Sequence, residues 1–170
     1  GGVIKVERLS VIDFYDPEDV AATGRGWDKG ATEGSGDPSA GVKVSKMKNG
    51  RWLIRHVKTG QWSALKRERR MKALAATDGI GTTVVIEQEP GAGGKESAEA
   101  SVRNLAGFIV QIVTSTVAKE LRAEAFAIQV EAGNVDLLRG EWNQPYIDEL
   151  ETFPAGSHDD QVDGTSVVFN

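Results

Sequence analysis

The sequence contains no cysteine and only two histidines, His56 and His158. The absence of cysteine excludes disulfide bonds, thiolate-bound zinc, iron–sulfur clusters and a cysteine nucleophile. Two histidines are too few for a site built from several imidazoles, so a metal ion would be bound by carboxylates, which favour Mg2+ or Mn2+. No apolar run approaches the about 20 residues needed to span a bilayer, and the first residues lack the pattern of a signal peptide. We therefore expect a soluble cytoplasmic protein with no membrane partner.

The 170-residue chain is long enough for one compact domain with a buried core. Its net charge of −5 hides a strong asymmetry along the sequence. Residues 43–72 contain eleven Lys or Arg and one acidic residue, whereas residues 131–170 contain nine acidic residues and one base, Arg139. Two interpretations are open: the basic residues keep a hairpin and an amphipathic helix hydrated, or they contact phosphates beside a cation-binding acidic cluster.

Hydrophobic periodicity predicts a mixed sheet flanked by helices. Residues 20–28 are expected to form a strand that ends in Asp28. Residues 41–48 and 51–58 alternate in the manner of strands, and Asn49-Gly50 joins these two as a hairpin turn. Antiparallel strands followed by crossover helices indicate an α/β fold with helices on both faces of the sheet. Residues 1–19 show no clear period and are expected to be a lead-in or linker segment before the domain at 20–170. The other expected elements are a loop over 30–39, helices over 61–77, 95–106, 118–132, 143–151 and 159–169, and strands over 82–86, 108–113 and 135–138.

Acidic residues end two predicted strands and begin the last predicted helix. Asp28 ends the first of these strands, and Glu87 follows the apolar run 82–86. In open α/β sheets, the strand ends and the loops after them carry the chemistry. The third group lies in SHDDQVD (157–163). There, Ser157 as a helix cap and acidic residues in the first helical turn would account for one or two of the aspartates.

Capping does not explain two adjacent aspartates, because close carboxylates repel each other unless they are protonated or share a cation. On a helix, Asp160 and Asp163 would share one face, and so would Asp159 and Asp163. Two divalent ions about 3.5–4 Å apart can activate a water and stabilise the leaving oxygen of a phosphodiester. The basic segment could then hold a duplex by its phosphates without reading bases. The sequence therefore predicts a metal-dependent nuclease whose metal-binding and catalytic residues come from Asp28, Glu87, Asp159, Asp160 and Asp163.

Five segments in a fixed order carry a family resemblance: GRGWDKGAT (24–32), VVIEQEPGAGGK (84–95), KELRAEAFAIQVEAG (119–133), LRGEWN (138–143) and ELETFPAGSHDDQVD (149–163). Together they resemble the nuclease domain of the large terminase subunit of tailed bacteriophages. The resemblance implies an RNase H-like fold of the resolvase/integrase type. It also implies metal binding by Asp28, by Glu87 and by the closing motif, where we expect Asp160 as the main ligand and Asp159 or Asp163 as a supporting one.

The segment GAGGKES (91–97) does not fit a phosphate-binding loop, because Glu89 stands where a glycine is required and Glu96 follows Lys95. We expect it to be a flexible active-site loop in which Lys95 contacts DNA. The positions of Lys119 and Arg122 in the family make them further candidates for DNA contact, although a hydrated helix face explains them equally well. The basic meander adds the candidates Arg51, Arg55 and Lys58.

The resemblance implies an endonuclease that uses Mg2+ or Mn2+, with two ions in the site. It would cut double-stranded concatemeric viral DNA during packaging in the host cytoplasm, with little sequence preference. We expect a monomeric C-terminal piece of a longer protein that also has an ATPase domain and works with a small terminase subunit and a portal. Two alternatives stay open: a non-cleaving module of the same fold that binds DNA or the motor, and another RNase H-like enzyme such as a Holliday-junction resolvase.

Overall fold

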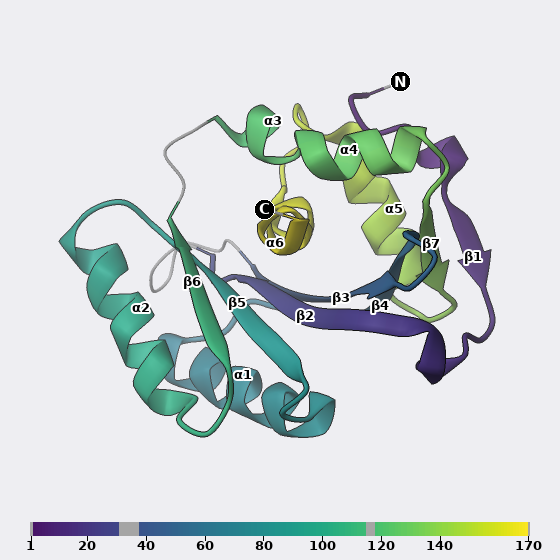
Figure 1. Cartoon of the computed structure of the whole chain (residues 1–170). Coiled ribbons are helices and arrows are strands. Elements are labelled where there is room, and N and C mark those ends of the chain that lie inside the picture. The colour runs from purple at the N-terminus through teal and green to yellow at the C-terminus, as the bar shows by residue number, and fades with distance from the viewer. Residues whose placement is uncertain (1, 31–37, 115–117, 170) are drawn as a thin grey trace.

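The computed structural model describes residues 2–30, 38–114 and 118–169. These residues form one mixed sheet in the order β1-β7-β4-β3-β2-β5-β6 (Figure 1). Strands β2, β3 and β4 are antiparallel neighbours, and the other neighbouring pairs are parallel. The predicted mixed α/β sheet is therefore confirmed. Its strands are β1 (Ser10–Ile12), β2 (Val20–Asp28), β3 (Ser39–Met47), β4 (Trp52–Gly60), β5 (Thr82–Gln88), β6 (Val110–Thr114) and β7 (Val135–Leu138).

Helices cover both faces of the sheet, as the sequence predicts. One face carries α1 (Ala64–Asp78) and α2 (Ala92–Asn104). The opposite face carries α3 (Lys119–Arg122), α4 (Glu124–Glu131), α5 (Asn143–Thr152) and α6 (Asp160–Phe169) (Figure 1). Short 3-10 turns, η1 (Val6–Arg8) and η2 (Pro17–Asp19), precede the central strands. Each of these helices is too short or too polar to cross a lipid bilayer.

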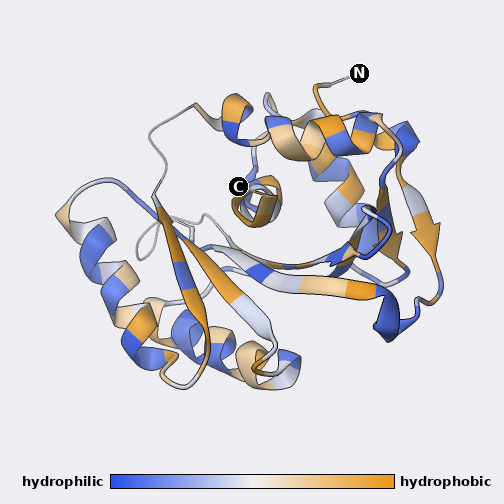
Figure 2. Cartoon of the chain, viewed as in Figure 1, coloured by the Kyte–Doolittle hydropathy of each residue, from blue (hydrophilic) through white to orange (hydrophobic). Residues whose placement is uncertain are grey.

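Two apolar clusters hold the layers together. The larger lies between the sheet and α4–α6 and includes Phe126, Tyr146 and Leu150. The smaller lies under α1 and includes Trp27 and Met71. Apolar colour follows β5 and β6, while blue patches mark the outer faces of α1 and α2 (Figure 2). The sheet is thus buried on both sides at its centre, which is why the run in β5 is apolar without alternation.

The predicted hairpin turn forms at Asn49-Gly50. Gly50 adopts φ +88° and donates its backbone N–H to Met47 O at 2.9 Å, and Met47 N donates to Arg51 O at 2.8 Å. A positive φ is easily reached by glycine, so this residue fixes the turn. The loop predicted over 30–39 lies largely outside the described residues.

Strand β2 positions the later site because its two faces differ. Gly24 and Gly26 face α6, and a Cβ atom on Gly26 would lie 2.0 Å from the backbone oxygen of Gly164. The missing side chains let the backbone of α6 lie directly on the strand. Since side chains alternate along a strand, Asp28 points to the same face as Gly26, towards the first turn of α6.

Residues 2–19 pack against the domain. Strand β1 pairs in parallel with β7, with Val11 opposite Leu137. Ile4 is buried in the larger cluster. The sequence predicts no element here, because a three-residue edge strand has too few residues to show a period. Whether the segment also serves as a linker stays a prediction.

Two sequence expectations are corrected by the structure. The segment 91–97, predicted as a flexible active-site loop, is instead the N-cap Gly91 and the first residues of α2, which begins at Ala92. Gly91 has φ +91°, and a Cβ on Gly94 would lie 2.0 Å from Glu89 O, so these glycines serve a tight turn between β5 and the helix. The helix predicted over 118–132 is interrupted at Ala123, which separates α3 from α4.

Candidate metal centre

Asp28 and Glu87 lie side by side at one edge of the sheet. Strands β2 and β5 are parallel, with Trp27 opposite Ile86. The next residues along the two strands, Asp28 and Glu87, therefore leave the sheet at the same end. Their proximity is also evident in the charge of Glu87, which raises the pKa of Asp28.

The first turn of α6 brings the other acidic residues to this edge. Asp163 N donates to Asp159 O at 2.9 Å, the i to i−4 bond that begins the helix, so the two side chains share one helical face. Asp28, Asp159 and Asp163 each offer a carboxylate oxygen, and these three oxygens lie within 4.8 Å of one another. Asp163 is buried, and Asp28 and Asp159 are half-buried.

The electrostatics of this group favour a cation. Burial raises the pKa of Asp28 well above its ordinary value, and the charges of Asp163, Glu87 and Asp160 raise it further. One contact opposes them, because the backbone N–H of Gly30 donates to Asp28 Oδ1 at 2.9 Å and lowers the pKa. A divalent ion among these oxygens would remove the repulsion, and carboxylate oxygens are the ligands that Mg2+ and similar ions prefer. The donor set therefore fits a hard divalent cation.

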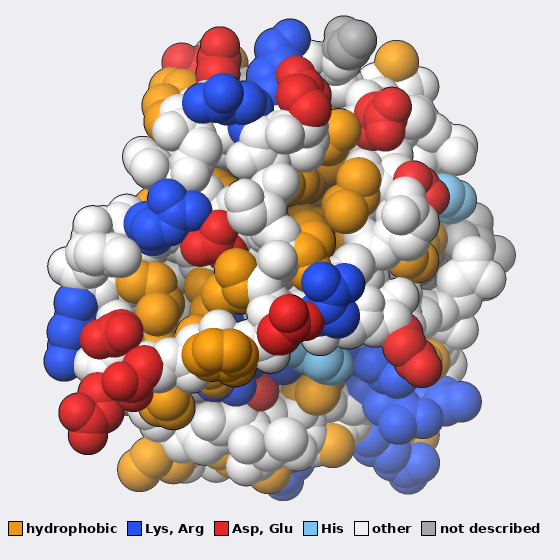
Figure 3. Space-filling view, turned by 90° about the vertical axis from the view of Figure 1, so that its right-hand side faces the viewer, with side chains coloured by type: hydrophobic (Ala, Val, Ile, Leu, Met, Phe, Trp, Pro, Cys, Tyr) orange, Lys and Arg blue, Asp and Glu red, His pale blue; other side chains and the backbone are white. Residues whose placement is uncertain are grey.

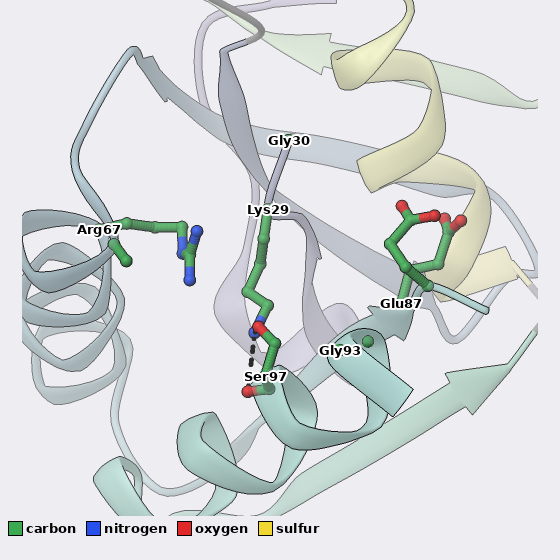
Figure 4. A pocket seen from close by; sticks show the side chains of 9 residues that line it. Lys29, Gly30, Arg67, Glu87, Gly93 and Ser97 are labelled. Atoms are coloured by element: carbon green, nitrogen blue, oxygen red, sulfur yellow. Dashed lines mark hydrogen bonds between the residues drawn. The ribbon is translucent and has the colours of Figure 1, made fainter. Parts of the chain in front are cut away.

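A pocket of about 540 Å3 lies next to Glu87. Figure 4 shows Arg67 reaching from α1 towards Lys29, with Glu87 on the other side of Lys29. A group bound in the pocket would thus lie between cationic side chains and the acidic edge of the sheet. The lining residues are Lys29, Gly30, Ala64, Arg67, Glu87, Glu89, Gly93, Gly94 and Ser97.

Lys29 ties the end of β2 to the two helices of the opposite face. Its Nζ donates to Ser97 O at 3.0 Å, to Ser97 Oγ at 2.6 Å and to Ser101 Oγ at 2.9 Å (Figure 4). Ser101 in turn donates to Glu68 on α1. Burial lowers the pKa of Lys29 to about 8, although the charge of Glu68 opposes the shift. This network fixes the strand end that carries Asp28.

Comparison with known proteins places the chain in a family. The profile of the family described as the terminase RNase H-like domain matches residues 25–170. The chain belongs to this family. A comparison with curated protein sequences finds no match.

Solved structures share the fold of this terminase RNase H-like domain. The magnesium-bound large terminase nuclease of the thermophilic phage G20c has 17% sequence identity and a TM-score of 0.71, covering 99% of this chain and 96% of that chain. The large terminase nuclease domain of Thermus phage P74-26 has 17% identity and a TM-score of 0.70, with 99% and 94% covered. The yeast mitochondrial Holliday junction resolvase is more distant, with 10% identity, a TM-score of 0.54, and 88% and 77% covered. The expected RNase H-like fold is confirmed.

Two of the five predicted acidic residues of the terminase domain are not among the three that offer mutually close oxygens, although the charges of both raise the pKa of Asp28. Glu87 forms an ion pair with Arg122 of α3. Asp160 is buried. It lies near enough to Glu149 of α5 for its charge to raise the pKa of Glu149. The pKa of Glu149 rises to about 7, chiefly through burial. The geometry favours the pairing of Asp159 with Asp163, while the role of Asp160 as main ligand stays a prediction.

Sequence reasoning missed the roles of Glu149 and Lys29. Glu149 stands in ELETFP, ahead of the acidic motif, but no period or spacing links it to a helix that begins eleven residues later. Lys29 follows Asp28 directly, yet a lysine after a strand is common on hydrated surfaces. For Arg122 the sequence suggests DNA contact, whereas in the structure it forms an ion pair with Glu87. All three roles depend on contacts between distant elements.

Some of the residues predicted to contact DNA are paired within the protein, and others are exposed. Arg51 pairs with Asp136 at 2.8 Å, and Arg55 donates to Tyr15. Lys58 and Lys95 are exposed. The side chain of Lys119 lies outside the described part of the structure. Lys and Arg side chains gather at the lower right of the face seen in Figure 3, and others lie separately over the rest of that face. DNA contact by all these residues, Arg122 included, stays a prediction.

Proposed function

We propose that this domain is a metal-dependent endonuclease that cuts double-stranded viral DNA during genome packaging. Membership of the terminase RNase H-like family supports the reaction class. The observation that carries the proposal is the convergence of Asp28, Asp159 and Asp163 at the end of β2. Mg2+ or Mn2+ is the proposed cofactor, with two ions in the site.

Each acidic residue has a proposed role. Asp28, Asp159 and Asp163 hold the ions directly, and Glu87 completes the group from β5. Bound ions would supply activation of the attacking water and stabilisation of the leaving oxygen. Arg122, which forms an ion pair with Glu87, would balance part of the negative charge of the group. Asp160 would add a further ligand from the same turn of α6, as the family resemblance implies.

The substrate chemistry follows from the basic segment. Lysines and arginines of residues 43–72 would hold the duplex through its phosphates, which gives affinity with little sequence preference. Arg67, which lines the pocket next to Glu87 and pairs with Glu68, would contact a phosphate near the cleaved bond. In a longer protein, the ATPase domain, the small terminase subunit and the portal would be partners, and the protein would act in the cytoplasm of the infected host cell.

Nicking of supercoiled plasmid with Mn2+ tests the proposal. Asp28→Asn and Asp163→Asn should each lower the nicking rate by about 10–100-fold or more. Loss of a residue that only hydrogen-bonds to a metal ligand already has an effect of that size, and these two residues are proposed as the ligands themselves. Both variants should stay folded in EDTA, because each removes one of the repelling carboxylates. Asp13→Asn is the matched control, since Asp13 is exposed and pairs with Arg139 away from the site.

The outcomes separate the proposal from a binding module. A domain that shifts DNA in a gel but leaves it intact with Mg2+ and Mn2+ would be a binder only. Full nicking activity in both variants would show that the acidic group is not the catalytic site. Comparison of a linear duplex with a four-way junction would reveal a resolvase by its preference for the junction.

A further inference from the structure

Glu149 contacts the helix that carries the acidic group. It is 8% exposed, and its Oε2 accepts the backbone N–H of Val162 at 2.8 Å. Its Oε1 accepts the side-chain amide of Gln161 at 3.0 Å. Both contacts join α5 to the first turn of α6, between Asp160 and Asp163 in sequence.

The N–H of Val162 is one that α6 itself leaves without a helical acceptor. The first i to i−4 bond of the helix is donated by Asp163, so the amides before it need other partners. A helix usually obtains such a partner from a residue at its own start. Here a carboxylate from another helix supplies it, and the negative charge also suits the N-terminal end of the helix dipole.

Three further contacts set the position of α6. Its backbone lies on β2 at Gly26, where any side chain would collide with Gly164 O. Farther along the helix, Tyr146 of α5 and Thr165 share a hydrogen bond of 2.8 Å between their hydroxyl groups. Ala40 O also lies close to Gly164. These contacts hold α6 against the sheet and against α5. Among the contacts named here, only those from Glu149 are made to the first turn of α6, which carries the proposed ligands Asp159 and Asp163.

We propose that Glu149 is a positioning residue: its carboxylate holds the first turn of α6 so that Asp159 and Asp163 meet Asp28 with the spacing a divalent ion requires. The inference rests on the proposed metal-dependent function. It assigns Glu149 no contact with metal or DNA. Its effect reaches the site through the backbone of residues 159–163.

Two substitutions distinguish the length of the Glu149 side chain from its negative charge. Glu149→Asp keeps the charge but retracts the carboxylate by about one C–C bond, about 1.5 Å, which takes the 2.8 Å contact out of hydrogen-bond range. Glu149→Gln loses the charge but keeps an oxygen that can accept the N–H of Val162. If position matters, Glu149→Asp should raise the dissociation constant for Mn2+ about tenfold or more, and Glu149→Gln should stay within about threefold of the wild type.

The primary readout is Mn2+ binding to the protein without DNA, followed by electron paramagnetic resonance of the free ion. The Mn2+ concentration for half-maximal plasmid nicking is the second readout and should move in parallel. Tyr146→Phe is the structural control, because it removes another α5–α6 hydrogen bond but leaves the first turn of α6 intact. It should lower thermal stability without changing Mn2+ binding. Glu151→Asp, on the exposed side of α5, controls for the shortening itself.

Each outcome decides one question. Wild-type affinity in Glu149→Asp would overturn the inference, as would a larger loss in Glu149→Gln than in Glu149→Asp, since charge would then matter more than reach. An equal loss in Tyr146→Phe would show only that α6 needs general support, and would also overturn it. If the wild type itself neither binds Mn2+ nor cuts DNA, the proposed function fails. If the wild type does both and the variants match it, only the positioning role fails.

Discussion

Removal of Asp78 should destabilise the protein far more than removal of an exposed ion-pair partner. Arg25 Nε lies 2.7 Å from Asp78 Oδ2, and the side chains are only 2% and 4% exposed. A second hydrogen bond joins Arg25 Nη2 to Asp78 Oδ1 at 3.1 Å, and Lys43 Nζ lies 3.3 Å from the same oxygen. Asp78→Ala would therefore leave a buried guanidinium without its carboxylate. Breaking a buried pair in this way costs about 3–5 kcal/mol.

Urea denaturation at pH 7 in EDTA measures this loss, with an unchanged dependence on urea showing that the two-state analysis holds. Asp13→Ala is the matched control, because Asp13 lies 2.5 Å from Arg139 but the two side chains are 68% and 64% exposed. Its loss should stay within about 1 kcal/mol. Equal losses in the two variants would refute the reasoning. Adding Arg25→Met to Asp78→Ala should recover part of the stability, since no buried charge is then left unpaired.

The same pair predicts a pH dependence. Burial alone would raise the pKa of Asp78, but the hydrogen bonds and charges of Arg25 and Lys43 outweigh it and lower the pKa. A carboxyl group whose pKa is lower in the folded state stabilises the fold above its unfolded value of about 3.9 and loses that effect as the pH falls. The difference between wild type and Asp78→Ala should therefore shrink below about pH 4.

Two further predictions concern the site. Gly26→Ala would place a methyl group 2.0 Å from Gly164 O. It should lower the free energy of unfolding, measured with urea, by about 1–3 kcal/mol or more, and it should weaken Mn2+ binding. Gly81→Ala is the control and should not affect binding, because the space around Gly81 is open. Glu149 has its pKa raised to about 7 from an ordinary 4.5. Its contribution to stability is therefore fully present below pH 4.5 and lost as the pH rises to 7, about 3 kcal/mol in the metal-free protein. Urea titrations across that range should show a shallower decline for Glu149→Gln, and parallel curves would contradict the shift.

The elements that could be predicted from the sequence are those with a strong local pattern. Strand β7 lies where predicted, at 135–138, and β2 runs from Val20 to Asp28 as expected, because turn residues flank both segments. Strand β1 was missed because its three residues become a strand only by pairing with β7. The prediction of one continuous helix over 118–132 is wrong, because α3 and α4 are separate helices. Leu121 and Ile128 are exposed, and Phe126 and Val130 face the core instead.

The acidic residues of the site could be named because their chemistry is local: two of them end strands and three begin a helix. Their grouping was only partly predictable. Helical spacing allowed Asp163 to pair with either Asp159 or Asp160, and the choice depends on how α6 is rotated on the sheet. That rotation is set by contacts with Gly26 and Glu149, which come from other elements. No pattern within SHDDQVD contains this information.

The alternation along β2 joins the stability of the fold to the position of the site. Arg25 and Trp27 point to the α1 face, where one binds Asp78 and the other fills the smaller apolar cluster. Gly26 and Asp28 point to the α6 face, where the first allows close packing and the second meets Asp163. A shift of β2 by one residue would exchange these faces, burying Arg25 against α6 and turning Asp28 away from the other acidic residues. The buried pair of Arg25 and Asp78 therefore opposes the same slip that would disperse the carboxylates.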